Sequence, residues 1–165
     1  MSPAGNGVRR RRAVRVLLLD ASDRLLLLHC ADTKNPARAP YWVTVGGGVE
    51  PGESDEDAAR REVREEVGIE DIEIGPLIAR YRSVFTFEGV DYDQENDYYL
   101  ARTEVTEVDG SGRDEIEVRS TLGHRWWTTE ELTSSTEEFT CPGLGPLLDQ
   151  TLRYGPPAPP VALAP

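Results

Sequence analysis

The sequence predicts one globular domain that combines β-strands with helices. The chain has 165 residues, which is long enough to bury a core without disulfides or a structural metal. Hydrophobic residues make up 38% and charged residues 29%, an ordinary composition for a soluble protein. Short β-prone segments are interspersed with segments of helical pattern along the chain. No apolar run approaches the roughly 20 residues of a membrane span, so we expect no membrane partner.

The first elements are two β-prone apolar segments, residues 13–19 and 24–29, and residues 20–23 between them form a good turn sequence. We therefore predict a hairpin. A polar loop over residues 31–40 leads into a short strand, residues 41–45, that ends at three glycines. The apolar stretch stops at Asp20 before a signal core can form, and we expect a cytoplasmic protein.

A helix is predicted over residues 55–67. Ser54 can cap it, and Asp55, Glu56 and Asp57 lie in the first turn, where the helix dipole favours negative charge. Gly68 ends it. Further strands are expected at residues 72–81, 84–87, 97–102 and 123–127, then a short helix from residue 129 and a last helix over residues 145–153.

Both ends of the chain have a composition that disfavours regular structure. We predict a flexible basic arm over residues 1–11, a single domain over residues 12–154 and a flexible proline-rich tail over residues 155–165. Arg9 to Arg12 could contact a phosphate, but a flexible arm is the preferred interpretation. Cys30 and Cys141 form no CxxC unit, and we expect free thiols.

The net charge of −12 constrains the partners of this protein. It disfavours long polynucleotides, whose phosphates require a surplus of Lys and Arg on the contact face. It also repels small phosphate esters. An acidic protein that acts on such a substrate therefore needs divalent cations to bridge the two, which directs attention to clustered carboxylates.

Three carboxylates share one face of the predicted helix. At 100° per residue, Glu62, Glu65 and Glu66 occupy about 100° of its surface. An apolar stripe lies directly beside them and can pack the helix on a sheet; it consists of Ala59, Val63 and Val67. Like charges at this spacing destabilise a helix, and Mg²⁺ or Mn²⁺ would offset the repulsion because these ions take oxygen ligands. The alternative is a solvated acidic face without metal.

The segment around this helix reads GGGVEPGESDEDAARREVREEVGI, and it resembles the Nudix box at every fixed position. From average residue frequencies, a chance match is on the order of one in a million. The resemblance covers residues 47–69, and the segment GHRWWTTEEL is similar to the usual layout of the family. The resemblance implies an α/β/α sandwich around a mixed, partly curled β-sheet.

The resemblance also implies roles for individual residues. Arg61 and Glu53 would pair and orient the loop and helix. A general base must take a proton from water, and in this family it lies in the box, as Glu65 or Glu66 would, or in a later loop. Glu117, in the acidic loop over residues 109–122, is the first candidate outside the box and Glu115 the second. The implied metal ligands are Gly47, through its carbonyl, and Glu62, Glu65 and Glu66.

The implied activity is metal-dependent hydrolysis of a diphosphate linkage in a small nucleotide-like substrate. Nucleoside triphosphates, sugar nucleotides, ADP-ribose and dinucleotides all fit, because the box handles the diphosphate and variable loops select the rest. Two other functions are considered: a Nudix-fold module that binds a nucleotide metabolite without hydrolysis, and an acidic structural domain without metal. A homodimer remains open.

Several other signals carry less weight. Acidic residues alternate over residues 91–97, but Asn96 and Arg102 stand where an EF-hand needs Gly and Glu, so an EF-hand is excluded. We expect a polar hairpin tip there, with a substrate-side loop as the alternative. His29 and His124 are expected in packing or surface roles. Six aromatic residues could stack on a base, but most should pack in the core. One of Tyr98 and Tyr99, and one of Trp126 and Trp127, should be exposed to the cleft or to solvent. The other two are Phe85 and Phe87.

Overall fold

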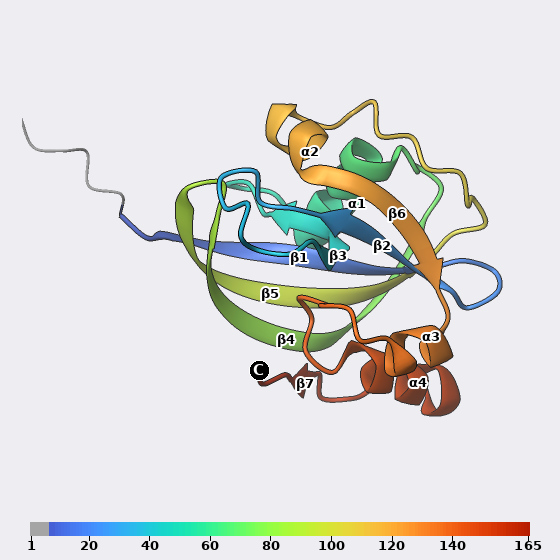
Figure 1. The fold of residues 1–165 in the computed structure, drawn as a ribbon. Coiled ribbons are helices and arrows are strands. Elements are labelled where there is room, and N and C mark those ends of the chain that lie inside the picture. The colour runs from blue at the N-terminus through green and yellow to red at the C-terminus, as the bar shows by residue number, and fades with distance from the viewer. Residues whose placement is uncertain (1–6) are drawn as a thin grey trace, which may run out of the picture.

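A mixed seven-stranded sheet with helices on both faces organises the chain (Figure 1). The computed structural model describes residues 7–165, and no helix within that range is long and apolar enough to cross a bilayer. The elements in chain order are β1 (Arg9–Leu19), β2 (Leu25–Cys30), β3 (Tyr41–Gly48), α1 (Asp55–Val67), β4 (Glu73–Phe87), β5 (Val90–Arg102), α2 (Glu115–Ser120), β6 (Thr121–Trp127), α3 (Thr129–Ser134), α4 (Leu144–Tyr154) and β7 (Val161–Ala162).

The strand β1 lies at the centre of the sheet, whose order is β6-β2-β3-β1-β5-β4-β7. It is antiparallel to β3 and parallel to β5, so the sheet is mixed as expected. The predicted β1–β2 hairpin is present. Its turn is held by Asp20, whose carboxylate accepts hydrogen bonds from the backbone N–H groups of Ser22 and Arg24 at 3.0 and 2.8 Å.

Alternation along β1 explains the two layers of helices, because successive strand side chains point to opposite faces of a sheet. Val14, Val16 and Leu18 are buried in a core cluster with the apolar stripe of α1. Leu17 and Leu19 are buried on the other face in a cluster with α4. Figure 1 shows α1 and α2 on one side of the sheet and α3 and α4 on the other. The predicted α/β/α sandwich is therefore confirmed.

Helix α1 has the predicted ends. The Ser54 hydroxyl accepts a hydrogen bond from the backbone N–H of Asp57, and Gly68 closes the helix in the left-handed conformation with φ of 70°. Ala59, Val63 and Val67 are fully buried. Their packing fixes the rotation of the helix about its axis and therefore the direction in which its glutamates point.

The structure corrects the prediction for residues 72–102. The two predicted strands over residues 72–87 form the single strand β4, and residues 91–97 lie within β5 rather than at a hairpin tip. The turn falls at Glu88 and Gly89, both with positive φ. The polar residues of β5 are accommodated because their partners are polar. Asp93, for example, accepts two hydrogen bonds from Arg82 at 2.8 and 2.7 Å.

The predicted boundaries of the arm and the tail also change. Residues 9–11, assigned to the arm, belong to β1 because they pair in register with residues 92–94 of β5. In the tail, β7 pairs with β4, and the Leu163 N–H donates to the Arg80 carbonyl at 2.8 Å. Valine and alanine can pair where the preceding prolines cannot. The first six residues of the predicted arm lie outside the described residues.

Candidate active site

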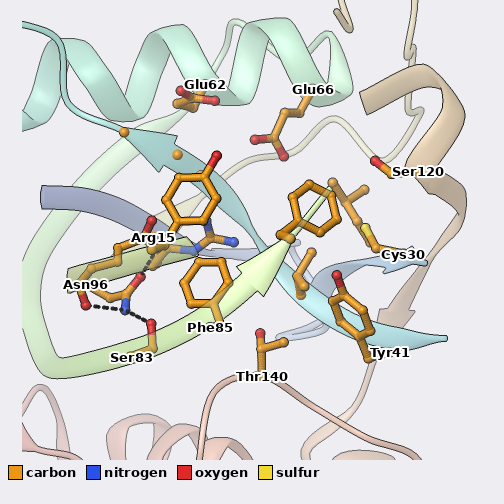
Figure 2. A pocket seen from close by; sticks show the side chains of 18 of the residues that line it. Arg15, Cys30, Tyr41, Glu62, Glu66, Ser83, Phe85, Asn96, Ser120 and Thr140 are labelled. Atoms are coloured by element: carbon orange, nitrogen blue, oxygen red, sulfur yellow. Dashed lines mark hydrogen bonds between the residues drawn. The ribbon is translucent and has the colours of Figure 1, made fainter. Parts of the chain in front are cut away.

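A cavity of about 810 Å³ lies beside the glutamate face of α1. Its walls come from α1, the end of β3, the start of β1, the β4–β5 hairpin and α2. Figure 2 shows Glu62 and Glu66 along one side of this cavity, with Phe85, Asn96 and Arg15 facing them. A cavity of this size accommodates a nucleotide-sized molecule.

Three carboxylates meet at the α1 side of the cavity. Glu62, Glu66 and Glu117 each offer an oxygen, and these oxygens lie within 4.8 Å of one another. Glu62 and Glu66 lie one turn apart on α1, as the spacing predicted. Glu117 comes from α2, a helix absent from the predicted elements and placed within the expected acidic loop. All three groups supply hard oxygen donors, so the set fits Mg²⁺ or Mn²⁺.

Burial makes the ionised forms of two of these carboxylates unfavourable in the metal-free protein. It raises the pKa of Glu66 well above its usual range, with Arg15 opposing the shift and Glu62 and Glu117 adding to it. Burial also raises the pKa of Glu117 to about 7; the hydrogen bond from the Asp114 backbone opposes this shift, and the charges of Asp114 and Glu62 add to it. A bound cation would reverse this balance, because it stabilises the carboxylates in their charged forms.

Helix α2 is positioned by a capping box. The Asp114 carboxylate accepts from the backbone N–H of Glu117 at 2.8 Å, and the Glu117 carboxylate accepts from the backbone N–H of Asp114 at 3.1 Å. Glu117 is half-buried at the cavity, whereas Glu115 is exposed and outside it. Of the two predicted candidates outside the box, Glu117 therefore lines the cavity and Glu115 does not. The Asp114-to-Glu117 spacing was the sequence signal for this short helix.

Arg61 links the loop, the helix and the end of β3. Its guanidinium donates to both Glu53 oxygens at 2.8 and 2.9 Å and to the Gly48 carbonyl at 3.0 Å, so the expected Arg61–Glu53 pair is present. It also donates to Glu62 at 2.9 Å. The hydrogen bonds from Arg61 to Glu53 lower the pKa of Glu53 to about 2. Arg61 thus orients a carboxylate of the cluster while it anchors the loop.

Gly47 lies against Glu62. A Cβ atom at this position would stand 2.6 Å from the Glu62 Oε1 atom, so the absence of a side chain allows the carboxylate to approach the end of β3. The predicted role of the Gly47 carbonyl as a metal ligand stays a prediction. Glu65 lines the cavity but is outside the three-carboxylate cluster, and its side chain pairs with Arg61 at 3.3 Å.

The aromatic residues divide between core and cavity. Trp127 is in the core, while Trp126 is half-buried and donates to the Thr106 carbonyl. Tyr99 is half-buried and donates to Asp55 at 2.6 Å. Tyr98, beside it, is buried, so the predicted alternation within each adjacent pair is present. The cavity itself is lined by Phe85, Phe87 and Tyr98, together with Tyr41, Tyr81 and Tyr92.

Cys30 and Cys141 are free and buried, as expected. His29 stacks on Trp42 with ring centroids 4.3 Å apart, a packing role. Arg15 was not predicted as a cavity residue, and for Arg11 a flexible arm was preferred over contact with a phosphate, because the inward direction of both side chains depends on the register of β1 in the sheet.

Comparison with known proteins identifies the domain. A family model described as the NUDIX domain matches residues 9–147. Nucleoside triphosphatase NudI of Escherichia fergusonii is 44% identical over 59 residues, which is 36% of this chain and 41% of that protein. The NudI protein of Salmonella agona gives the same values. The chain thus spans about two fifths of the length of these curated relatives.

Solved structures share the fold. The MutT protein from Methanosarcina mazei superposes with a TM-score of 0.62 at 19% identity, covering 88% of this chain and 95% of that one. The dihydroneopterin triphosphate pyrophosphohydrolase of E. coli superposes with a TM-score of 0.61 at 18% identity, covering 87% and 97%. At these identities the likeness concerns the fold.

Proposed function

The chain belongs to the Nudix family, and on this premise we propose that it hydrolyses a diphosphate linkage in a small nucleotide with the help of Mg²⁺ or Mn²⁺. The observation that carries the proposal is the cluster of Glu62, Glu66 and Glu117 at a cavity of nucleotide size. Among the substrates considered, nucleoside triphosphates come first, because the relatives named above are nucleoside triphosphatases. The acidic chain, with its net charge of −12, favours such a small substrate over a polynucleotide.

The carboxylates on α1 would hold the cation. Glu62 and Glu66 are the first ligands in this proposal, and Arg61 keeps the Glu62 carboxylate in place through a hydrogen bond of 2.9 Å. A divalent cation bound there would neutralise charge on the diphosphate oxygens and acidify a water molecule. Glu65 is a predicted ligand of lower rank, since its side chain is not part of the three-carboxylate cluster. The Gly47 carbonyl also remains a predicted ligand.

Glu117 is proposed as the general base. Its carboxylate lies beside those of Glu62 and Glu66 on a separate helix, and it can take a proton from the attacking water. The pKa of about 7 in the metal-free protein is close to neutral pH, where proton acceptance from water is efficient. The capping hydrogen bonds with Asp114 hold its backbone and one oxygen in position.

A substrate panel tests this proposal. The full-length protein would be incubated with Mg²⁺ or Mn²⁺ and nucleoside triphosphates, sugar nucleotides, ADP-ribose and dinucleotides, and the products identified by phosphorus NMR. We expect cation-dependent cleavage between two phosphorus atoms, fastest for a nucleoside triphosphate. Cleavage of another class would change the assigned substrate. Nucleotide binding without turnover of any compound would favour the binding module instead.

A further inference from the structure

The arginines at the start of β1 separate into two sets by the face of the sheet on which they lie. Arg10 approaches Asp93 at 3.7 Å, and Arg12 pairs with Asp55 at 2.7 Å and Asp97 at 3.3 Å. Arg11 and Arg15, on the opposite face, line the cavity. Neither of these two has a carboxylate oxygen within 4.0 Å among residues 7–165.

Arg11 and Arg15 are half-buried and have only neutral hydrogen-bond partners within the described chain. The Arg11 Nε–H donates to the Gln94 side-chain oxygen at 2.6 Å, and the guanidinium lies 4.7 Å from the centre of the Tyr92 ring. The Arg15 guanidinium donates to the Thr44 hydroxyl at 3.0 Å and to the Thr44 carbonyl. Each guanidinium therefore retains N–H groups that can donate to a molecule in the cavity.

Unpaired cations at this depth are unfavourable unless an anion joins them. The protein has 30 Asp and Glu against 18 Lys and Arg, so carboxylates to pair with these cations are plentiful. Burial lowers the pKa of Arg11, while Tyr92 and Glu62 act in the opposite direction. Glu62 and Glu66 act on these guanidiniums only from beyond salt-bridge distance, so a bound anion could still make a close charged contact with each of them.

The two guanidiniums face the carboxylate cluster. Figure 2 shows Arg15 across the cavity from Glu62 and Glu66. Arg11 lines the same cavity as Glu62, Glu66 and Glu117, and the charge of Glu62 acts on its guanidinium. An anion between the two walls could therefore contact an arginine on one side and a carboxylate-bound cation on the other.

A chain of amides holds Arg11 in place. Gln94, which accepts from Arg11, donates to the Asn96 side-chain oxygen at 2.6 Å, and Asn96 donates to the Tyr81 carbonyl at 2.9 Å and the Ser83 hydroxyl at 3.0 Å. Gln94 and Asn96 are both buried. Such a network orients the guanidinium before a ligand arrives.

We propose that Arg11 and Arg15 form an anion subsite that binds the polyphosphate chain of the substrate on the side opposite the three carboxylates. The assignment of the anion to a substrate rests on the proposed function, whereas phosphate binding by the two arginines does not. Arginine suits this task because its planar guanidinium donates two parallel hydrogen bonds to a phosphate group.

Inorganic tripolyphosphate is the direct probe, because it carries the phosphates without a base. Its affinity for the full-length protein with Mg²⁺ would be measured by calorimetry for the wild type, Arg11→Gln and Arg15→Gln. Each change removes charged hydrogen bonds and should weaken binding by about tenfold to 100-fold. Arg10→Gln is the matched control: it removes the same charge from the same strand, but its side chain is 85% exposed on the other face, and we expect a change of less than about twofold.

Three other results would be equally informative. Tripolyphosphate affinity within about twofold of the wild type in both variants would overturn the subsite, and if Arg15→Gln fails to fold, Arg11→Gln decides. In a second outcome, the uncharged nucleoside of the preferred substrate inhibits turnover of the two variants less than turnover of the wild type, while tripolyphosphate binding is retained. That result would assign the arginines to recognition of the base and would also overturn the subsite. Wild-type protein that binds tripolyphosphate through these arginines but hydrolyses no compound of the panel would refute the proposed function and leave the subsite standing.

Discussion

Glu66 on α1 and Glu117 on α2 offer carboxylate oxygens within 4.8 Å of one another, although the two helices belong to separate stretches of the chain. Glu62 brings a third oxygen within the same distance. Mutual repulsion and burial oppose the simultaneous ionisation of the three groups, so the folded protein maintains an arrangement that a cation would stabilise.

The metal-free protein should lose stability as the pH rises from about 4.5 through 7. The folded-state pKa of Glu117 is about 7 and that of Glu66 is also raised, so the folded protein retains protons that the unfolded chain releases near pH 4.5. The stabilising effect is complete below that pH and disappears above the folded pKa. Urea unfolding with a chelator between pH 5 and 8 should show a smaller decline for Glu66→Gln than for the wild type. Parallel curves would contradict the raised pKa values.

Glu117→Gln should lower kcat by about 100-fold or more while Mn²⁺ binding changes little, because the amide cannot take a proton from water. Steady-state kinetics and a calorimetric Mn²⁺ titration measure the two effects separately. Glu115→Gln is the control, since Glu115 is exposed and outside the cavity. An unchanged rate in Glu117→Gln would place the base elsewhere, and lost Mn²⁺ binding would make Glu117 a ligand instead.

Glu53→Gln should destabilise the protein at neutral pH and much less in acid. The pair with Arg61 lowers the pKa of Glu53 to about 2, so its contribution to stability is present above about pH 4.5 and is lost as the pH falls toward 2. The free energy of unfolding of wild type and variant would be compared at pH 7 and pH 3. An equal difference at both values would show that charge plays no part in the pair.

Glu88→Gln should lower the free energy of unfolding by about 1–3 kcal/mol. The Glu88 side chain is 2% exposed at the β4–β5 turn, where it accepts from the Thr33 backbone at 3.0 Å and from the Thr33 hydroxyl, and it pairs with Arg119 of α2 at 3.4 Å. These contacts tie three segments together beside the cavity. Glu138→Gln removes an exposed pair with Arg38 and should change stability by less than about 1 kcal/mol. Equal effects in the two variants would contradict the role of burial.

The site shows which features local sequence determines. Helix α1 was predictable from Ser54 to Gly68, because capping, apolar spacing and the face shared by Glu62 and Glu66 are local properties of a 3.6-residue period. Glu117 was predicted as a candidate residue, but its position beside that face could not be predicted, since it depends on where the tertiary fold places α2 relative to α1. The short helix α2, which carries Glu117, was not predicted because it lies in a segment that was expected to be an acidic loop.

The sheet shows the same division between local and long-range information. The β5 segment over residues 91–97 looked like a turn because strand propensity disfavours Asp and Asn. Its pairing with β1 and β4, and the ion pair of Asp93 with Arg82, outweigh that propensity. Likewise, the basic start of the chain became part of β1 only through its register with β5, which also turned Arg11 toward the cavity.

The most direct test of the central claim is cation-dependent turnover in Glu66→Gln. Pyrophosphate release from the preferred nucleoside triphosphate would be followed across a Mg²⁺ titration for the wild type, Glu66→Gln and Glu56→Gln. Glu56 lies on the same helix but is exposed and pairs with Arg60, so it serves as the control. We predict that Glu66→Gln folds, loses at least about 100-fold in turnover and gains no thermal stability from Mg²⁺, while Glu56→Gln matches the wild type. Turnover and Mg²⁺ dependence like those of the wild type in Glu66→Gln would contradict a metal centre held by Glu62 and Glu66.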